Sequence, residues 1–196
     1  MGLIEEILVR PKLRQKLWAW WYPFFTRRVR EQGVDFLNYA FEDTEAPRLA
    51  LAEADEPNRP NIQLYEHVRG GVDLRGRRVL EVSCGHGGGA SYFARTYAPT
   101  GYVGLDLNPE AIRHCQARHQ VAGLAFQVGD ALKLPFDENT FDVTTISFGL
   151  RNTSDTATAV KEALRVTKNG GRIVVAEFSH PTNKLFKFIY LNLKCI

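Results

Sequence analysis

The stretch that decides the fold is residues 79–90, VLEVSCGHGGGA, in which a hydrophobic run leads directly into a glycine-rich turn. The run at residues 79–82 is apolar apart from Glu81, as expected for a strand that is buried on both faces. Glycine has no Cβ atom, so it allows positive φ angles and lets a ligand approach backbone N–H groups. A helix predicted over Ser91–Tyr97 directs its N-terminus at the same place, which is a site for negative charge. The stretch therefore predicts a strand, a ligand-binding turn and a helix in succession.

Four further short runs rich in β-branched residues follow, separated by helix-length segments. They are Tyr102–Asp106, Ala125–Val128, Phe141–Phe148 and Arg172–Phe178. Alternating strands and helices of this kind predict an α/β fold, an open, doubly wound and mostly parallel sheet.

The helix signals between these runs agree with that fold. Asn108-Pro109-Glu110 combines an N-cap, a first-turn proline and a first-turn acid, and predicts a helix that reaches about His119. Ser154 or Asp155 predicts the start of a second helix, which we expect to run to Lys168 and to end at Gly170-Gly171.

The chain has 196 residues, for which a single domain is the default. Its N-terminal part differs in character, because residues 1–30 carry a net charge of +5 and residues 31–60 a net charge of −6. Neither segment shows the alternation typical of strands. We expect residues 1–70 to form a helical lid or acceptor segment, residues 71–180 the ligand-binding domain, and residues 181–196 a short helix or tail.

Composition excludes several classes of protein. A net charge of +3 is too small to imply a nucleic-acid partner, and three cysteines without a C-x-x-C pair predict neither a disulfide framework nor a metal centre. The same cysteine pattern favours a reducing cytosol, and Leu17–Phe25 is interrupted by proline and is shorter than a membrane span, so we expect a cytoplasmic protein. Aromatic residues flanked by Arg and Lys over Arg14–Arg30 fit peripheral membrane contact or a lid over a lipid acceptor, and a packing helix is the alternative.

Acidic side chains end the second and third predicted strands. Asp106 follows the glycine turn by about 20 residues, where a carboxylate typically binds the two hydroxyls of a ribose. Asp130, next to Ala131, lies at the end of the third strand, where it can accept a hydrogen bond from the amine of a base. The strand ends therefore predict a nucleoside-containing ligand.

Two ligands fit this edge. Residues 85–90, GHGGGA, satisfy the G-x-G-x-x-G/A dinucleotide pattern, so a nicotinamide-dependent oxidoreductase is one interpretation. S-adenosylmethionine (SAM) is the other, and it is favoured by Glu81 inside the first strand and by the Asp130-Ala131 pair.

Residues 81–87, EVSCGHG, resemble motif I of the class I SAM-dependent methyltransferases, and Asp106 and Asp130-Ala131 match the acids that follow it in that family. The resemblance implies that the methionine end binds near Glu81 and Gly85, the ribose at Asp106 and the adenine at Asp130. The implied cofactor site consists of Glu81, Ser83, Cys84, Gly85, Gly87, Asp106, Leu107, Asp130, Ala131 and Ser147. Ser83 departs from the family because it stands where the first motif glycine is usual.

Two narrower resemblances concern the acceptor. Residues 18–142 resemble the mycobacterial phthiotriol and phenolphthiotriol dimycocerosate methyltransferases, which methylate a lipid alcohol, in residues 21–23, 55–59, 81–90 and 104–108. Residues 141–190 resemble the demethylmenaquinone methyltransferases, which methylate a quinol ring, in residues 145–152 and 170–179. We expect a hydrophobic acceptor, most simply a lipid hydroxyl. A quinol ring and a catalytically inactive SAM-binding protein are the alternatives.

The class I fold normally ends with an antiparallel hairpin after the fifth strand, whereas 17 residues follow Ser179 here. We therefore expect a sheet without that hairpin and with one exposed edge.

Candidates for proton transfer are few. His86, within the glycine turn, is a weak candidate for a general base, with a packing role as the alternative. His114 and His119 are expected to be solvated, and Cys84 is expected to be a buried small residue rather than a nucleophile.

Overall fold

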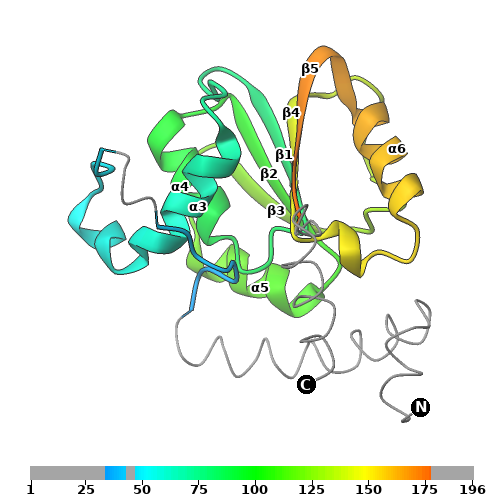
Figure 1. Ribbon diagram of the computed structural model, residues 1–196. Coiled ribbons are helices and arrows are strands. Elements are labelled where there is room, and N and C mark those ends of the chain that lie inside the picture. The colour runs from blue at the N-terminus through cyan, green and yellow to red at the C-terminus, as the bar shows by residue number, and fades with distance from the viewer. Residues whose placement is uncertain (1–33, 43–46, 178–196) are drawn as a thin grey trace, which may run out of the picture.

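The computed structural model describes residues 34–42 and 47–177 (Figure 1). The predictions for Arg14–Arg30 and for residues 181–196 lie outside these ranges.

In the part of the chain that the structure describes, five parallel strands form a single sheet in the order β3-β2-β1-β4-β5. The strands are β1 (Arg78–Val82), β2 (Gly101–Asp106), β3 (Leu124–Val128), β4 (Phe141–Ser147) and β5 (Thr167–Ala176). The strand order reverses at β1, which lies between β2 and β4. The prediction of an open, doubly wound α/β sheet is confirmed, and the reversal places a ligand crevice at the carboxyl end of β1.

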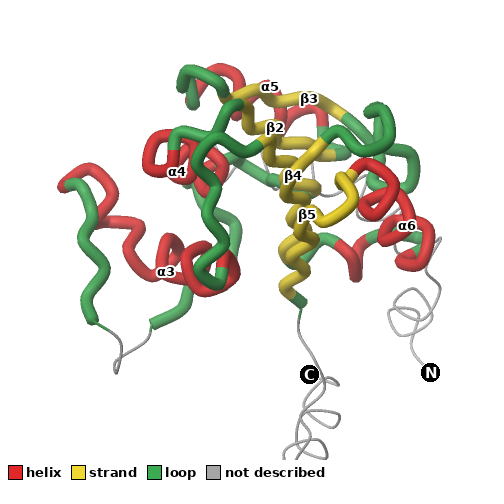
Figure 2. The backbone as a smooth tube through the Cα atoms, turned by 90° about the horizontal axis from the view of Figure 1, so that it is seen from above, coloured by secondary structure: helices red, strands yellow, loops and turns green. Residues whose placement is uncertain are grey.

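Helices cover both faces of the sheet (Figure 2). The helical elements are η1 (Glu53–Asn58), α3 (Arg59–Arg69), α4 (Gly88–Tyr97), α5 (Pro109–Arg118), η2 (Leu150–Asn152) and α6 (Thr156–Val166). Helices α3, α4 and α5 pack on one face around a core that includes Ile62, Phe93 and Cys115. Helix α6 packs on the other face, where Ala159, Ala163 and Val166 meet strand residues. Each face of the sheet therefore has its own apolar core.

Both helix starts have the predicted caps. The side-chain oxygen of Asn108 accepts a hydrogen bond from the Glu110 amide at 3.0 Å, and Pro109 occupies the first turn of α5. The Asp155 carboxylate accepts from the Thr158 amide at 3.0 Å, so Asp155 caps α6. These caps satisfy amides that would otherwise have no partner at the helix start.

The predicted end of α6 is wrong. The helix ends at Val166, the chain enters β5 directly at Thr167, and Gly170 and Gly171 lie inside the strand. Thr167 is buried, and its hydroxyl group lies 2.7 Å from that of Thr144 in β4. This hydrogen bond holds Thr167 in the sheet, so the strand begins directly after the helix. Gly170 and Gly171 belong to a β-bulge instead, because the register of β4 and β5 shifts there and Gly170 has a φ of +77°.

Among the described residues, β5 is an edge strand that pairs with β4 alone. The expected absence of a hairpin after this strand, and the exposed edge that it implies, concern residues 178–196, which lie outside the described ranges. Within the same ranges, no helix combines the length and the apolar character needed to cross a bilayer.

Candidate cofactor site

The predicted site residues gather at the carboxyl edge of the sheet. Glu81 lies in β1, and the other nine follow or end four neighbouring strands. Four residues come after β1, one ends β2 and one follows it, two come after β3, and one ends β4: Ser83, Cys84, Gly85, Gly87, Asp106, Leu107, Asp130, Ala131 and Ser147. The topology therefore brings together residues that lie up to 66 positions apart in the sequence.

The glycine turn alternates left-handed and ordinary backbone. Ser83, Gly85 and Gly87 have φ angles of +62°, +57° and +76°. Helix α4 begins at Gly88, three residues before the predicted start at Ser91. A Cβ atom on Gly87 would lie 2.8 Å from the Phe126 ring, so the close approach of this turn to β3 requires glycine. The turn thus holds its backbone amides at the start of α4, as the sequence predicted.

Ser83 keeps the left-handed backbone that a glycine would adopt there. Its φ of +62° is unfavourable for a residue with a side chain. The side chain packs against Gly149, where an added Cβ atom would lie 2.5 Å from the Ser83 Oγ atom. The departure from the family motif therefore leaves the backbone path unchanged and introduces strain.

A Ser83→Gly variant is expected to be more stable than the parent protein by about 1 kcal/mol, because it relieves this strain. The measurement is urea unfolding followed by circular dichroism. Ser91→Gly, inside α4, is the matched control and is expected to lose roughly 0.5 to 1 kcal/mol. A loss of stability in both variants would show that Ser83 is not strained.

Glu81 is a buried acid beneath the glycine turn. It is 2 % exposed, and its two carboxylate oxygens accept hydrogen bonds from the hydroxyls of Tyr65 and Tyr102, both at 2.8 Å. Burial raises the pKa of Glu81 to about 7, against the effect of the two tyrosine hydrogen bonds, which lower it. Gly89 makes this arrangement fit, because a Cβ atom there would overlap the ring of Tyr65. Glu81 therefore contributes charge from beneath the turn rather than by direct exposure.

Asp106 organises the two loops on either side of the crevice. Its Oδ2 atom accepts a hydrogen bond from the Gly85 amide at 3.0 Å, and its Oδ1 atom accepts from the Asn108 amide at 2.9 Å. Burial raises the pKa of Asp106, and the backbone hydrogen bonds oppose that rise. Each carboxylate oxygen has a further lone pair, so Asp106 can also accept from the hydroxyls of a ligand.

The ends of β2 and β3 expose apolar side chains beside a carboxylate. Leu107 is 55 % exposed and Val128 is 47 % exposed, and Asp106 and Val128 are partners in the register of the two strands. Asp130 is exposed and accepts a hydrogen bond from the Leu132 amide at 2.9 Å, while Ala131 is half-buried. An exposed apolar surface next to an acceptor is suited to a planar ring with an exocyclic amine.

Residues 34–42, here called the strap, run next to the glycine turn. The Val34 carbonyl lies 2.7 Å from His86 Nδ1, and the Asp35 carbonyl accepts from the Gly88 amide at 3.0 Å. A Cβ atom on Gly85 would be 3.3 Å from Leu37, so the Leu37 side chain sits at the turn. The strap reaches the sequence after β4 as well, because the Tyr39 and Phe148 rings meet at 5.2 Å.

The histidines near the turn are more enclosed than expected. His86 is 1 % exposed, and because a carbonyl oxygen only accepts, its Nδ1–H donates to Val34. This contact supports the packing interpretation of His86. His114 is 8 % exposed, so the expectation that it is solvated is wrong, and His119 is only half-buried. The reason is that the strap brings Asp35 to within 3.6 Å of His114. Cys84 is 5 % exposed, as a small buried residue should be.

An apolar groove lies on the same face of the sheet as α3. It is lined by Val68 and Val72 near α3 and by Val143 and Val174 of the sheet, and it reaches Ser147 at the end of β4. The groove therefore connects an apolar surface to the carboxyl edge that carries the predicted cofactor residues.

Three contributors to the site were not predicted. Tyr65 and Tyr102 hold Glu81, and Leu37 lies against Gly85. The only sequence signal for the tyrosines was the acid itself, since a carboxylate inside a buried strand requires hydrogen-bond donors.

Comparison with known proteins places this geometry in a family. The model of the "ubiE/COQ5 methyltransferase family" matches residues 66–194, which is more than half of the chain. The phthiotriol/phenolphthiotriol dimycocerosates methyltransferase of Mycobacterium leprae is 43 % identical over 171 residues, or 87 % of this chain and 63 % of the relative. The fatty-acid O-methyltransferase of Mycolicibacterium smegmatis is 51 % identical over 121 residues, or 62 % of this chain and 44 % of the relative.

A solved structure shares the fold. The SAM-dependent methyltransferase from Aquifex aeolicus superimposes with a TM-score of 0.57 and 19 % identity, over 67 % of this chain and 73 % of that one. At this identity the likeness concerns the fold alone.

The matches also bear on the two narrower resemblances, which met near residues 141–143. Any 171 consecutive residues of this 196-residue chain include residues 26–171, so the match to the Mycobacterium leprae protein crosses that point. The family match over residues 66–194 crosses it too, so neither match stops where the two resemblances meet.

The chain spans 63 % of the length of the Mycobacterium leprae relative. From its glycine turn to its fifth strand, the chain belongs to the ubiE/COQ5 methyltransferase family.

Proposed function

We propose that this chain binds SAM at the carboxyl edge of its sheet and transfers the methyl group to an oxygen atom of a hydrophobic acceptor, most simply a lipid hydroxyl. The observation that carries the proposal is the pairing of a left-handed glycine turn with two buried acids. Glu81 lies beneath the turn, and Asp106 joins the turn to the next strand through the Gly85 amide.

The charges of the site favour SAM over a nicotinamide dinucleotide. SAM carries a positive sulfonium and a positive ammonium group, whereas a dinucleotide carries a negative pyrophosphate. Two acids within the glycine turn region attract the first and repel the second. The exposed Leu107 and Val128 supply an apolar surface for the adenine, and Asp130 supplies an acceptor for its amine.

The residues of the chain would act chiefly by binding and orientation. SAM, when bound, supplies an electrophilic methyl group on a positively charged sulfur. Asp106 would hold the ribose, and the glycine turn with Glu81 beneath it would lie against the methionine end. Alignment of two bound reactants contributes roughly 7 to 11 kcal/mol at the upper end, so orientation by these residues is the main catalytic device.

Two observations support a lipid acceptor. The relatives at 43 % and 51 % identity are named for a phthiotriol lipid and for a fatty acid. The apolar groove between α3 and the sheet is small, and Ser147 at the cofactor edge belongs to its lining, so an apolar part of an acceptor can pack there. C-methylation of a demethylmenaquinol-like ring is the second candidate, because residues 145–152 and 170–179 resemble the demethylmenaquinone methyltransferases.

The test is methyl transfer from SAM that carries a labelled methyl group. The purified 196-residue chain is incubated with a long-chain secondary alcohol, a long-chain fatty acid or a demethylmenaquinol, and label is counted in the lipid phase. Alkaline hydrolysis then distinguishes the products, because a methyl ester releases its label and an ether or a ring methyl does not. An Asp106→Asn variant is the control for cofactor dependence.

The proposal expects label in the alcohol or the fatty acid and none with the variant. Label confined to the quinol would replace the proposal with ring methylation. Saturable SAM binding without label in any acceptor would favour an inactive SAM-binding protein.

A further inference from the structure

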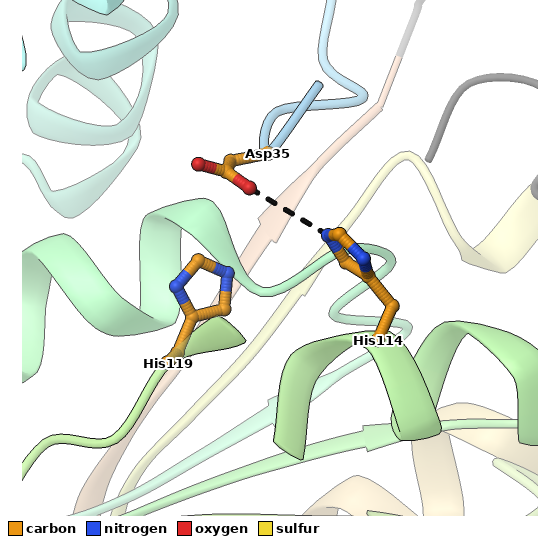
Figure 3. A group of neighbouring side chains, drawn as sticks. All are labelled: Asp35, His114 and His119. Atoms are coloured by element: carbon orange, nitrogen blue, oxygen red, sulfur yellow. Dashed lines mark ion pairs between the residues drawn. The ribbon is translucent and has the colours of Figure 1, made fainter. Parts of the chain in front are cut away.

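Three side chains outside the cofactor site converge between the strap and α5. Asp35 comes from the strap, His114 from α5, and His119 from the residue directly after that helix (Figure 3). One carboxylate oxygen and one nitrogen of each imidazole lie within 4.8 Å of one another. Convergence of two histidines and a carboxylate on one point is typical of a site for a transition-metal ion.

His114 points into this cluster without a hydrogen-bond partner. Its side chain is 9 % exposed, and among the described residues its Nε2 atom makes no hydrogen bond. Oδ1 of Asp35 lies 3.6 Å from this nitrogen, which is beyond hydrogen-bond range. Leaving a buried polar nitrogen unsatisfied costs about 1 to 3 kcal/mol, so such an atom calls for an explanation. A metal ion between Nε2 and Oδ1 of Asp35 would give the His114 nitrogen a partner.

His119 is held by the glycine turn. Its Nε2 atom lies 2.8 Å from the carbonyl oxygen of His86, and because that oxygen only accepts, the nitrogen carries the ring hydrogen. For Nε2 to bind a metal ion, the hydrogen must move to Nδ1. The His86 carbonyl oxygen, which now occupies the hydrogen-bonding direction of Nε2, must also shift aside to make room for the ion. Burial lowers the pKa of His114 and of His119, which favours the neutral imidazole that metals require.

We propose that Asp35, His114 and His119 bind a divalent transition-metal ion, with Zn²⁺ the best match for two imidazoles and one carboxylate. This site revises the prediction that the chain has no metal centre. The sequence alone does not indicate this site, because Asp35 lies 79 residues before His114 and neither residue is part of a recognisable metal-binding motif.

Arg118 competes with a metal ion for Asp35. Its guanidinium contacts both oxygens of that carboxylate, with Nε at 3.2 Å from Oδ1 and Nη2 at 3.3 Å from Oδ2. The Arg118 side chain is 57 % exposed, so it can retain Oδ2 or swing into solvent when Oδ1 binds a metal. Without metal, the Asp35–Arg118 ion pair accounts for the position of the carboxylate. It leaves the buried nitrogen of His114 unexplained.

A metal ion here would fasten the strap to α5. The strap already contacts the glycine turn through the Val34 and Asp35 carbonyls, so fixing Asp35 also fixes the segment that holds Leu37 at Gly85. The site therefore links metal binding to the order of the strap, whether or not the proposed methyl transfer is correct.

The test is titration of the metal-free, full-length chain with Zn²⁺ by calorimetry. Co²⁺ titration followed by visible absorption gives a second readout. His114→Gln, His119→Gln and Asp35→Asn remove the three ligands one at a time, and circular dichroism checks that each variant is folded. His67→Gln is the matched control, because His67 is an exposed histidine of α3.

We expect one Zn²⁺ per chain, at least about a 10- to 100-fold weaker affinity in each ligand variant, and no change in the control. Zn²⁺ should also slow hydrogen exchange of the strap amides in the parent protein and not in Asp35→Asn. Asp35→Asn keeps the shape of the side chain and the backbone contacts of the strap, so it decides the outcome if a histidine variant fails to fold. The proposal is wrong if the folded parent takes up no Zn²⁺ saturably, or if the three variants bind it as the parent does.

Discussion

As the pH rises from 5 to 8, the stability of a Glu81→Gln variant is expected to increase by about 2.5 kcal/mol relative to that of the parent protein. The pKa of Glu81 is about 7 in the folded protein and is near 4.5 in the unfolded chain. Between these values the folded state binds more protons than the unfolded state. The free energy of unfolding of the parent therefore falls as pH rises through this window, and the penalty is complete above pH 7.

Glutamine has the shape of glutamate and no charge, so the variant avoids the penalty. It retains one acceptor for Tyr65 or Tyr102, and its amide can donate to the other hydroxyl. The measurement is urea unfolding of both proteins at pH 5 and pH 8, with Glu53→Gln as the control because Glu53 is exposed. If the two stability–pH curves ran parallel, Glu81 would have an ordinary pKa in the fold. The stabilised variant should bind SAM more weakly, because it lacks the negative charge beneath the turn.

A Gly89→Ala variant is expected to lose about 3 kcal/mol of stability or more. The added methyl group would overlap the ring of Tyr65, which cannot retreat without giving up its hydrogen bond to Glu81. The control is Gly101→Ala at the start of β2, where a Cβ atom would meet no heavy atom within 4 Å. Both changes add one methyl group, so their difference isolates the effect of Tyr65.

A double-mutant cycle tests this cause directly. In a Tyr65→Ala background the overlap is gone, so Gly89→Ala should cost much less than in the parent protein. Additive losses in the double variant would show that the methyl group clashes with another part of the structure.

The sequence predicted the parts of the fold that depend on local pattern. The glycine turn, the strand runs and the caps at Asn108 and Asp155 each follow from residues close together in the chain. The position of Asp106 at the end of the second strand was predictable for the same reason, whereas its binding of a ribose stays a prediction.

The misplaced features depend on contacts between distant segments. The end of α6 is decided by the hydroxyl of Thr144, which lies 23 residues from Thr167 and holds it in the sheet. The burial of His114 is decided by Asp35 in the strap. The support of Glu81 comes from Tyr65 in α3 and Tyr102 in β2. No periodicity or motif encodes such pairings, since they appear only when the strand order is known.

The central claim is that the carboxyl edge of the sheet is a SAM site organised by Asp106. Calorimetric titration of the 196-residue chain with SAM, beside an Asp106→Asn variant and with NADH as the rival ligand, tests it most directly. Asparagine keeps one acceptor oxygen, so the variant loses at least one hydrogen bond to a charged group, which contributes about 1.5 to 3 kcal/mol and should weaken binding by about 10-fold or more. We predict saturable binding of one SAM molecule to the parent protein, this loss of SAM affinity in a folded Asp106→Asn variant, and no binding of NADH. Equal SAM affinity in the two proteins, or binding of NADH in place of SAM, would contradict the claim.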